Sequence, residues 1–513
     1  MSLLVAATIS RQQPQQRIIV GVSSFVLFRP VLRRAAVTTT RHRHFGSKNS
    51  NMNTNSKVED LHQQNDELLT ATANVVAKFV SATQTSLNEC GERLRSGHLV
   101  SFPTETVYGL GCHALDPIAV QKVFDAKERP LSDPLIVHVN NAEDALNMWS
   151  SSTSASYDSS KNSSNSFVTD IEGLALAALT SVYFPGPLTI VAKACSTMPQ
   201  ILMAGTGYVA CRSPSHSVAR ALINAACVPI AAPSANKFGH VSPTCAQHVM
   251  DDLGQEDVWI IDPSLGMIDE EDDNIRKMDD DDNDGSGGNT ESDQTGVCQV
   301  GVESTVVKVE MNPPDSSKML SSLSDEEILG NITILRHGAI SVESIRKTIK
   351  DAGLSRYFHI AEKMKFTSEA SHNVAPGQMI KHYSPNVPTF MIGRSRQQNI
   401  QQEALVNEVQ NDITFLDEEQ SILSKSVIID YGGRLVHYKP FALVYRDLSP
   451  DCDPATAASI LFETLRWSET IDGAIRVFVP ELVLEGEGVD PLVLAVKDKL
   501  TRAASAVIVE RFQ

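Results

Sequence analysis

The chain has 513 residues, of which 42% are apolar, and its formal net charge is −18. This length and composition predict ordinary globular cores in two or three domains. The acidic balance argues against a broad surface that tracks nucleic-acid phosphates, and no apolar run approaches the length of a membrane span. Eight cysteines occur without a C-x-x-C pair, which argues against zinc-ribbon and thioredoxin-type sites and predicts free thiols.

The N-terminal segment differs in charge from the rest of the chain. Residues 1–58 contain nine Lys and Arg residues and no Asp or Glu. A basic, Ser- and Thr-rich segment without acids is typical of an organelle transit peptide, so we expect a mitochondrial or plastid location. The alternatives are a disordered basic tail and a cytoplasmic form that begins at Met52.

The next part of the chain predicts an α/β domain over residues 85–350. Residues 59–95 have a helical pattern, and strand-like runs alternate with helical stretches after it. The predicted strands are Leu99–Pro103, Leu135–Val139, Leu188–Ala192, Val209–Arg212, Val228–Ala232, Val258–Asp262, Thr305–Val309 and Ile332–Leu335. Two low-complexity inserts, 150–166 and 269–296, interrupt the domain, and we expect both to be solvated loops.

A linker over 360–388 and a smaller α/β unit over 389–513 complete the chain. Strands are predicted at Thr389–Ile392, Ser426–Ile429, Phe441–Tyr445 and Val477–Val479, with helices at Ala455–Trp467 and Pro491–Ala506. The linker contains APGQMIKHYSP, in which a Pro-Gly turn precedes a group of polar side chains. We expect it to close over a ligand as a lid; the alternative is a packed strap between the two units.

Candidate ligand-binding residues gather in two places. The segment DAKERPLSDP carries Lys127 and Arg129, which on an extended or loop segment would point to the same side and clamp a polyphosphate. Ser234 and Asn236 follow an apolar strand, at the edge where open α/β sheets bind ligands. Ser242-Pro-Thr244 is predicted to open the next helix, whose free N–H groups would form an anion site. No G-x-x-x-x-G-K-[ST] or G-x-G-x-x-G signature is present.

Three pieces of the sequence resemble the YrdC-type threonylcarbamoyl-AMP synthases. They are SFPTETVYGLG at 101–111, the Lys127/Arg129 pair together with Ser234 and Asn236, and GVEST at 301–305. The linker and the region to residue 513 resemble the long, two-domain form. The resemblance implies a YrdC-like twisted mixed-sheet domain with a ligand cavity, followed by a smaller Rossmann-like α/β domain.

The resemblance also implies a substrate set. Such enzymes condense L-threonine, bicarbonate and ATP, release pyrophosphate and supply an activated group for threonylcarbamoyladenosine in tRNA. The residues implied for threonine are Thr106, His138, Arg212, Ser234 and Ser304. Those implied for ATP are Lys127, Arg129, Asp133, Tyr208, Asn236, Ser242, Thr244, Arg336 and Tyr383. The chain departs from the family at Asp133, where Asn is common, at Tyr208, where Thr is common, and at Ile380, where some members have Tyr.

The chemistry implied by the resemblance needs positioning and electrostatics more than a base. Lys127 and Arg129 would offset the charge that develops on the α-phosphate and the pyrophosphate. Mg²⁺ is expected with the phosphates, held mainly by them and by water rather than by the protein. The partner would be a downstream tRNA threonylcarbamoyl transferase. Direct binding of tRNA or other double-stranded RNA stays open, as does the alternative of a nucleotide- or RNA-binding regulatory module without turnover.

Overall fold

The computed structural model describes residues 77–150, 165–265, 298–312, 328–362, 373, 375, 383–398, 417–484 and 489–509. Residues 1–58, nearly all of the insert 150–166, the whole insert 269–296 and most of the linker lie outside these ranges, so the predictions made for them are unchanged. Of the described residues, no helix is long and apolar enough to cross a membrane.

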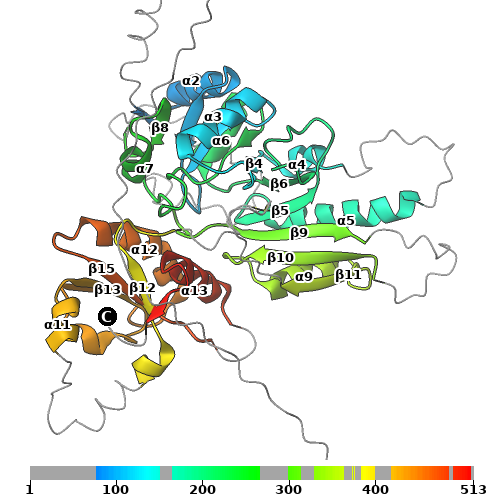
Figure 1. Cartoon of the computed structure of the whole chain (residues 1–513). Coiled ribbons are helices and arrows are strands. Elements are labelled where there is room, and N and C mark those ends of the chain that lie inside the picture. Colours follow the sequence, from blue (N-terminus) through cyan, green and yellow to red (C-terminus); the bar gives the residue numbers. More distant parts are fainter. Residues whose placement is uncertain are drawn as a thin grey trace, which may run out of the picture. The chain divides into compact units, whose positions relative to one another are not determined.

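The first part of the described chain forms one eleven-stranded mixed sheet (Figure 1). Its strands follow the order β1-β8-β2-β3-β7-β4-β6-β5-β9-β10-β11, and parallel and antiparallel pairs alternate irregularly along it. The strands are β1 Lys78–Ser81, β2 Leu99–Phe102, β3 Gly109–His113, β4 Ile136–His138, β5 Leu188–Lys193, β6 Tyr208–Arg212, β7 Ile230–Ala231, β8 Val258–Asp262, β9 Thr305–Met311, β10 Gly330–Arg336 and β11 Phe358–Glu362.

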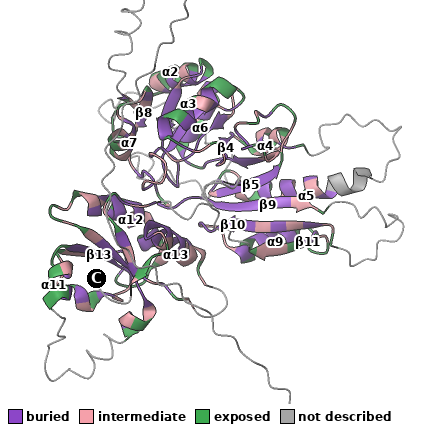
Figure 2. Ribbon diagram, viewed as in Figure 1, coloured by how far each residue is buried: buried purple, intermediate pink, exposed green. Residues whose placement is uncertain are grey.

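Helices pack against this sheet and bury its apolar side chains. They are α2 Gln84–Arg95, α3 Pro117–Lys127, α4 Ala142–Met148, α5 Asn165–Tyr183, α6 Ser217–Ala226, α7 Ala246–Leu253 and α9 Val342–Asp351. Figure 2 shows the central strands buried, while exposed residues lie on the outer faces of the helices. This alternation is what an amphipathic helix on a two-sided sheet produces.

The second part of the described chain forms a five-stranded, all-parallel sheet in the order β14-β13-β15-β12-β16. The strands are β12 Thr389–Ile392, β13 Ser426–Asp430, β14 Val444–Asp447, β15 Arg476–Pro480 and β16 Ile508–Val509. The helices are α11 Asp417–Leu423, α12 Pro454–Trp467 and α13 Pro491–Ala503, with single 3₁₀ turns η4 Val436–Tyr438 and η5 Ser468–Thr470. The predicted fold class, a mixed-sheet domain followed by a Rossmann-like unit, is therefore confirmed.

Several predicted elements differ from the observed ones. Phe79 and Val80, assigned to a helix over 59–95, lie in strand β1, which pairs with β8. Their β-branched and aromatic character supports a strand once a partner strand is present. Strand β7 has two residues because Pro229 and Pro233, which lack N–H donors, flank it. Strands β1, β3, β11 and β16 were not predicted.

The close contact of α2 with α6 depends on a glycine. A Cβ atom at Gly91 would lie 2.6 Å from the carbonyl carbon and oxygen of Ala225. Gly91→Ala should therefore destabilise the protein by about 1–3 kcal/mol through overpacking, although alanine favours an isolated helix by about 1 kcal/mol. Urea unfolding measures the change, with the exposed Glu89→Ala on the same helix as the control. A stabilising Gly91→Ala would show that the two helices are not held this closely.

Candidate active site

A pocket opens where the loops after β2 and β7 meet β4, β6 and β10. The start of β3, which follows the loop after β2, is fixed against the loop after β7, because the Leu110 amide donates to the Pro233 carbonyl and Gly109 bridges Ser234. The lining residues are Thr104, Thr106, Val107, Tyr108, Gly109, Arg129, Ile136, His138, Arg212, Ala232, Pro233, Ser234, Glu303, Ser304 and Arg336. All five residues predicted for threonine lie in this wall, together with two of those predicted for ATP.

One end of the pocket is organised around Arg212 at the end of β6. Its guanidinium donates to the Thr106 hydroxyl at 2.8 Å and to the Gly186 carbonyl, and it pairs with Glu105 at 2.7 Å. Thr106 in turn lies 2.9 Å from the Thr104 hydroxyl. These contacts engage three of the five N–H bonds of the guanidinium, so N–H donors remain for the carboxylate of a small ligand.

His138 lies beside Arg212 because β4 and β6 pair in parallel with these two residues opposite each other. Burial, reinforced by the nearby Arg212 charge, lowers the pKa of His138 to about 3. The imidazole is therefore neutral near pH 7, where it can form hydrogen bonds but is a weak proton acceptor. This leaves Arg212 as the cation at this end of the pocket and speaks against His138 as a general base.

Two more guanidinium groups, those of Arg129 and Arg336, line the same pocket, and we call their part of it the arginine end. Arg129 pairs with Asp133 at 2.8 Å and donates to the carbonyls of Asp133 and Pro134. Arg336, at the end of β10, donates to the carbonyl and the hydroxyl of Ser304, both at 3.0 Å. Both arginines are buried, and both are positioned by main-chain carbonyls. Buried cations fixed in this way form a preorganised site for anionic oxygens.

Asp133 is the carboxylate partner of Arg129, which accounts for an acid near a candidate phosphate site. Its carboxyl group also accepts a hydrogen bond of 3.4 Å from Asn373 of the linker. Burial raises the pKa of Asp133, and the Arg129 charge opposes this rise. This ion pair therefore reduces the repulsion expected between Asp133 and a phosphate. The geometry favours a role for Asp133 in holding Arg129 in place.

Lys127 ends helix α3 and Arg129 lies in the loop after it, so the prediction that both stand on one extended or loop segment was wrong. Lys127 is the last residue of α3, and Glu128 ends the helix with a left-handed conformation, φ 54°. The Lys127 ammonium donates to the carbonyls of Ser234, at 2.7 Å, and Asn236. It thereby holds the loop after β7 and lies behind the pocket wall, where burial and the Arg129 charge lower its pKa.

The segment after this loop also differs from its prediction. Helix α7 begins at Ala246 with Cys245 as its N-cap, so it starts after the Ser242-Pro-Thr244 segment that was predicted to open it. The Ser242 hydroxyl donates to Glu303 at 2.9 Å, and the Thr244 amide donates to His248. Asn236 donates to the carbonyls of Lys237 and His240. These predicted ATP residues thus shape the loop from 236 to 244 and do not line the pocket.

The two predicted tyrosines occupy different environments. Tyr208 shares a face of β6 with Arg212, but its hydroxyl donates to Glu310 and its ring lies 3.8 Å from the Lys308 ammonium. Tyr383 is fully buried against Phe462, with 5.2 Å between ring centroids. Burial and the Glu303 charge raise the pKa of Tyr383, so it remains a neutral phenol near the arginine end of the pocket.

Two acids of the site were missed by the sequence analysis. Glu105 pairs with Arg212, and Glu303 lines the pocket and lies 3.5 Å from the buried Lys499 of α13. Both stand inside the motifs TETVYG and GVEST, next to residues that were predicted. The sequence did contain a signal for both acids, because each stands within a motif whose neighbouring residues were predicted to bind ligand. Lys499 had no such signal, because it reaches the site from the second sheet.

Comparison with known proteins connects this geometry to a family. The Sua5/YciO/YrdC model, described as "Telomere recombination", matches residues 92–284, and the model "Threonylcarbamoyl-AMP synthase, C-terminal domain" matches 340–505. A threonylcarbamoyl-AMP synthase of Bacillus subtilis is 30% identical over 318 residues, which are 61% of this chain and 68% of that protein. The chain belongs to the threonylcarbamoyl-AMP synthase family.

Other members of this family give the same picture. Relatives named threonylcarbamoyl-AMP synthase from Pyrococcus abyssi and Schizosaccharomyces pombe are each 32% identical, over 58% and 61% of this chain. The matches span 65% and 64% of those relatives' lengths. The crystal structure of P. abyssi Sua5 complexed with L-threonine is 25% identical with a TM-score of 0.54, and it covers 85% of this chain and 99% of its own. A double variant of that protein shares the fold, with a TM-score of 0.56.

The environment of His138 makes a testable prediction. Its folded-state pKa lies below the ordinary value of 6.5, so its contribution to stability is complete above pH 6.5 and is lost as the pH falls towards about 3. The ring ¹⁵N chemical shifts of His138, assigned by comparison with His138→Gln, should stay those of a neutral imidazole from pH 8 to pH 5. The ring signals of the exposed His359, which His138→Gln leaves in place, serve as the internal control for the assignment. Titration of His138 near pH 6.5 would contradict the buried, Arg212-facing geometry.

Proposed function

We propose that this protein synthesises L-threonylcarbamoyl-AMP from L-threonine, bicarbonate or CO₂ and ATP, with release of pyrophosphate. One observation carries the proposal: a single pocket joins a guanidinium suited to a small carboxylate, Arg212, to a second cationic end built from Arg129 and Arg336. Membership of the threonylcarbamoyl-AMP synthase family supports the same reaction.

The Arg212 end suits threonine. The guanidinium would bind the substrate carboxylate, and the nearby groups that can hydrogen-bond a hydroxyl and an amine are Thr106, His138, Ser234 and Ser304. The related P. abyssi Sua5 forms a crystalline complex with L-threonine. Because His138 is neutral, it adds no second cation that would repel an ammonium group or favour a larger anion.

The Arg129 and Arg336 end suits the triphosphate of ATP. Both side chains are positioned before substrate arrives, so the charge that develops on the α-phosphate and the leaving pyrophosphate meets donors that need little reorganisation. Lys127 does not line the pocket but holds the loop after β7, which carries Ser234 and Asn236. We expect the residues predicted for ATP to act partly through this scaffold.

The reaction balances as two steps. The neutral amine of threonine forms an N–C bond with CO₂ and loses one proton, which gives a carbamate. A carbamate oxygen then forms a bond to the α-phosphorus of ATP, and the bond to the pyrophosphate breaks. Carbamates decompose in water, so the pocket must exclude solvent during the second step. Positioning and electrostatic stabilisation carry the catalysis, and no residue of the pocket is assigned as a general base.

The linker supports the proposal of a lid. Asn373 contacts Asp133, and Ala375 packs in a cluster with Ile136, which lines the pocket. Tyr383 is buried between the two sheets, close to the charges of Glu303 and Arg336. Described linker residues thus lie near the arginine end at both limits of the APGQMIKHYSP region. Closure of this segment over ATP would shield the carbamate.

Mg²⁺ would accompany the phosphates of ATP and offset part of their charge. Among the described residues, no group of three or more His, Cys, Asp or Glu side chains could hold a metal ion. The acids nearest the pocket are paired, Glu105 with Arg212, Asp133 with Arg129 and Glu303 with Lys499. This donor set fits an ion held by phosphate oxygens and water, and we propose no protein ligand.

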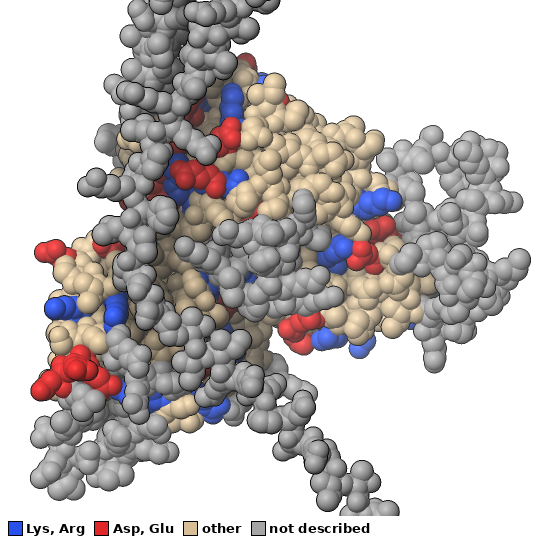
Figure 3. Space-filling view, viewed as in Figure 1, with Lys and Arg blue, Asp and Glu red and all other residues tan. Residues whose placement is uncertain are grey.

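The adenylate would be used by a tRNA threonylcarbamoyl transferase. On the face shown in Figure 3, basic and acidic side chains are interspersed over the described surface. A diffusible product needs no RNA-binding surface on this protein, so we assign the transfer to tRNA to the partner enzyme.

Incubation of the protein with ATP, threonine and ¹³C-bicarbonate, followed by mass spectrometry of the quenched mixture, tests the function directly. We expect a threonylcarbamoyl-AMP ion that carries the label and one pyrophosphate for each adenylate. ATP binding without pyrophosphate release would instead identify a regulatory nucleotide-binding protein and overturn the proposal.

Arg129→Ala should remove about 2–4 kcal/mol of transition-state stabilisation and lower kcat/KM for adenylate synthesis accordingly, because it removes one buried donor to the phosphates. Arg346→Ala removes an exposed arginine on α9, paired with Glu343, and is the matched control. Pyrophosphate release measured across ATP and threonine concentrations gives the constants. Wild-type kinetics for Arg129→Ala would remove this residue from the phosphate site.

A further inference from the structure

The loop from 236 to 244 connects the pocket to the second sheet. It begins at Asn236, whose carbonyl accepts from Lys127, and it carries Ser242, which donates to the pocket residue Glu303. Val241 is fully buried in the same apolar cluster as Leu461 and Leu465 of α12. The middle of this loop is therefore packed against the C-terminal part of the chain, while its ends shape the site.

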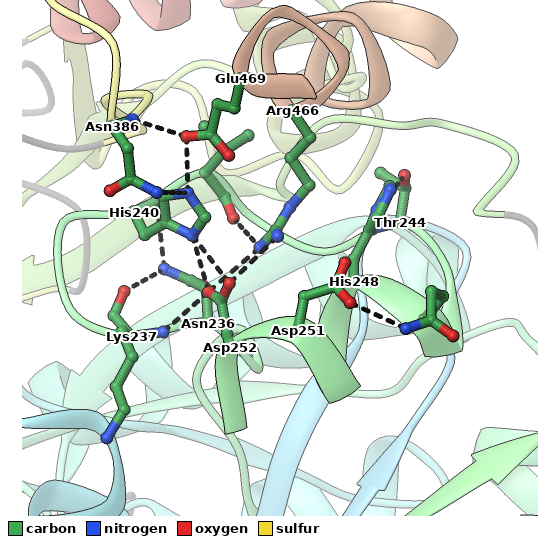
Figure 4. Close-up of polar contacts among 12 residues, drawn as sticks. Asn236, Lys237, His240, Thr244, His248, Asp251, Asp252, Asn386, Arg466 and Glu469 are labelled. Carbon is green, nitrogen blue, oxygen red and sulfur yellow. Dashed lines mark hydrogen bonds and ion pairs between the residues drawn. The ribbon is translucent and has the colours of Figure 1, made fainter. Parts of the chain in front are cut away.

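His240 lies at the centre of a polar cluster at this contact (Figure 4). Its Nδ1 lies 2.8 Å from Asp252 of α7, and its Nε2 lies 2.8 Å from Glu469 of η5. Arg466 of α12 contacts both carboxylate oxygens of Asp252 at 3.1 Å and donates to the Val241 carbonyl. Glu469 also accepts from the main-chain amide of Asn386, near the end of the linker.

This arrangement requires a particular protonation state. A neutral imidazole has one N–H donor, whereas each ring nitrogen of His240 faces an acceptor-only carboxylate. Both contacts are hydrogen bonds only when the ring is an imidazolium. Burial lowers the pKa of His240, but the hydrogen bonds to Asp252 and Glu469 outweigh it and raise the pKa to about 9. The cation is then the form present at neutral pH.

We propose that His240 is a positioning residue: as an imidazolium it ties the loop from 236 to 244 to the C-terminal sheet and thereby holds the phosphate end of the pocket in its binding geometry. This inference rests on the proposed function, since it assigns the loop to the ATP side of that site. His240 contacts no substrate. It acts through Asn236 and through Ser242, which fixes Glu303 beside the arginine end.

The charged groups that face His240 come from α7, from α12 and η5, and from its own loop. From α7, Asp252 faces the ring, and His248 keeps a lowered pKa of about 4 through burial and the Arg466 charge. From α12 and η5, Arg466 and Glu469 face it. On its own loop, the Lys237 ammonium is paired with Glu128 and Glu256. A rise in pH through about 9 therefore removes one proton from His240 and one of its two carboxylate contacts.

The test compares binding of a non-hydrolysable ATP analogue with an α,β-methylene bridge to the full-length wild type and to His240→Gln, by calorimetry at pH 7 and pH 10. We expect His240→Gln to bind the analogue about tenfold more weakly at pH 7, a factor equal to one pKa unit of coupling. At pH 10 the two proteins should bind it equally, because the wild-type ring is then neutral. Threonine affinity at pH 7 should be unchanged.

Controls separate this role from general damage. His359→Gln alters an exposed histidine on β11 and should match the wild type at both pH values. Glu469→Gln removes the carboxylate of η5 that faces His240, and it should reproduce the loss of affinity for the ATP analogue at pH 7. Glu463→Gln, on α12 in an exposed pair with Arg446, should not. If His240→Gln fails to fold, the comparison of Glu469→Gln with Glu463→Gln still tests the inference.

A ratio of affinities that is the same at pH 7 and pH 10 would overturn the inference, as would an equal loss of threonine binding. These results differ from a failure of the proposed function. A wild-type protein that binds no ATP analogue at all, or binds it without making adenylate, would point to the function itself.

Discussion

Positive charge buried beside the pocket is the constraint on which the rest of the site depends. Lys127, Arg129, Arg212 and Arg336 all have less than a tenth of their surface exposed. Moving such charges out of water is costly, and the cost is offset only when carbonyls and carboxylates meet them closely. The fold supplies these partners from several loops at once. The loops after β2, β7 and α3 and the residues just before β9 are therefore held in the arrangement that forms the pocket.

The same constraint explains why the second sheet belongs to the site. Glu303 would add negative charge to a pocket suited to phosphates, and it is met by Lys499, a fully buried ammonium on α13. Asp498 pairs with both Lys499 and Arg502, which spreads the compensation over one turn of the helix. The electrostatics of the first domain are thus completed by residues almost two hundred positions later in the chain. A site that looks local in sequence is shared between two cores in space.

The sequence predicted what depends on local pattern and on motif chemistry. Apolar runs such as Ile332–Leu335 and Val477–Val479 are strands, and five motif residues predicted for threonine do line one pocket. What depends on distant partners could not be predicted. The local pattern around Val80 predicts a helix, and only the pairing with β8 makes this residue part of a strand. Likewise, nothing in the sequence near Lys127 indicates that its ammonium donates to the carbonyls of residues 234 and 236. The helix start at Ala246 was misplaced because Ser242 serves Glu303 rather than the helix end.

The pairing of Glu303 with Lys499 has a consequence for how such a protein can change over evolutionary time. A gene shortened so that it encodes the first domain alone would leave this carboxylate on the wall of the pocket without its cation. The loss of α13 would then favour a neutral residue at position 303, because an unpaired carboxylate would repel phosphates. Domain architecture and the identity of one side chain are therefore linked: a lineage that sheds the second domain would be expected to replace this acid as well.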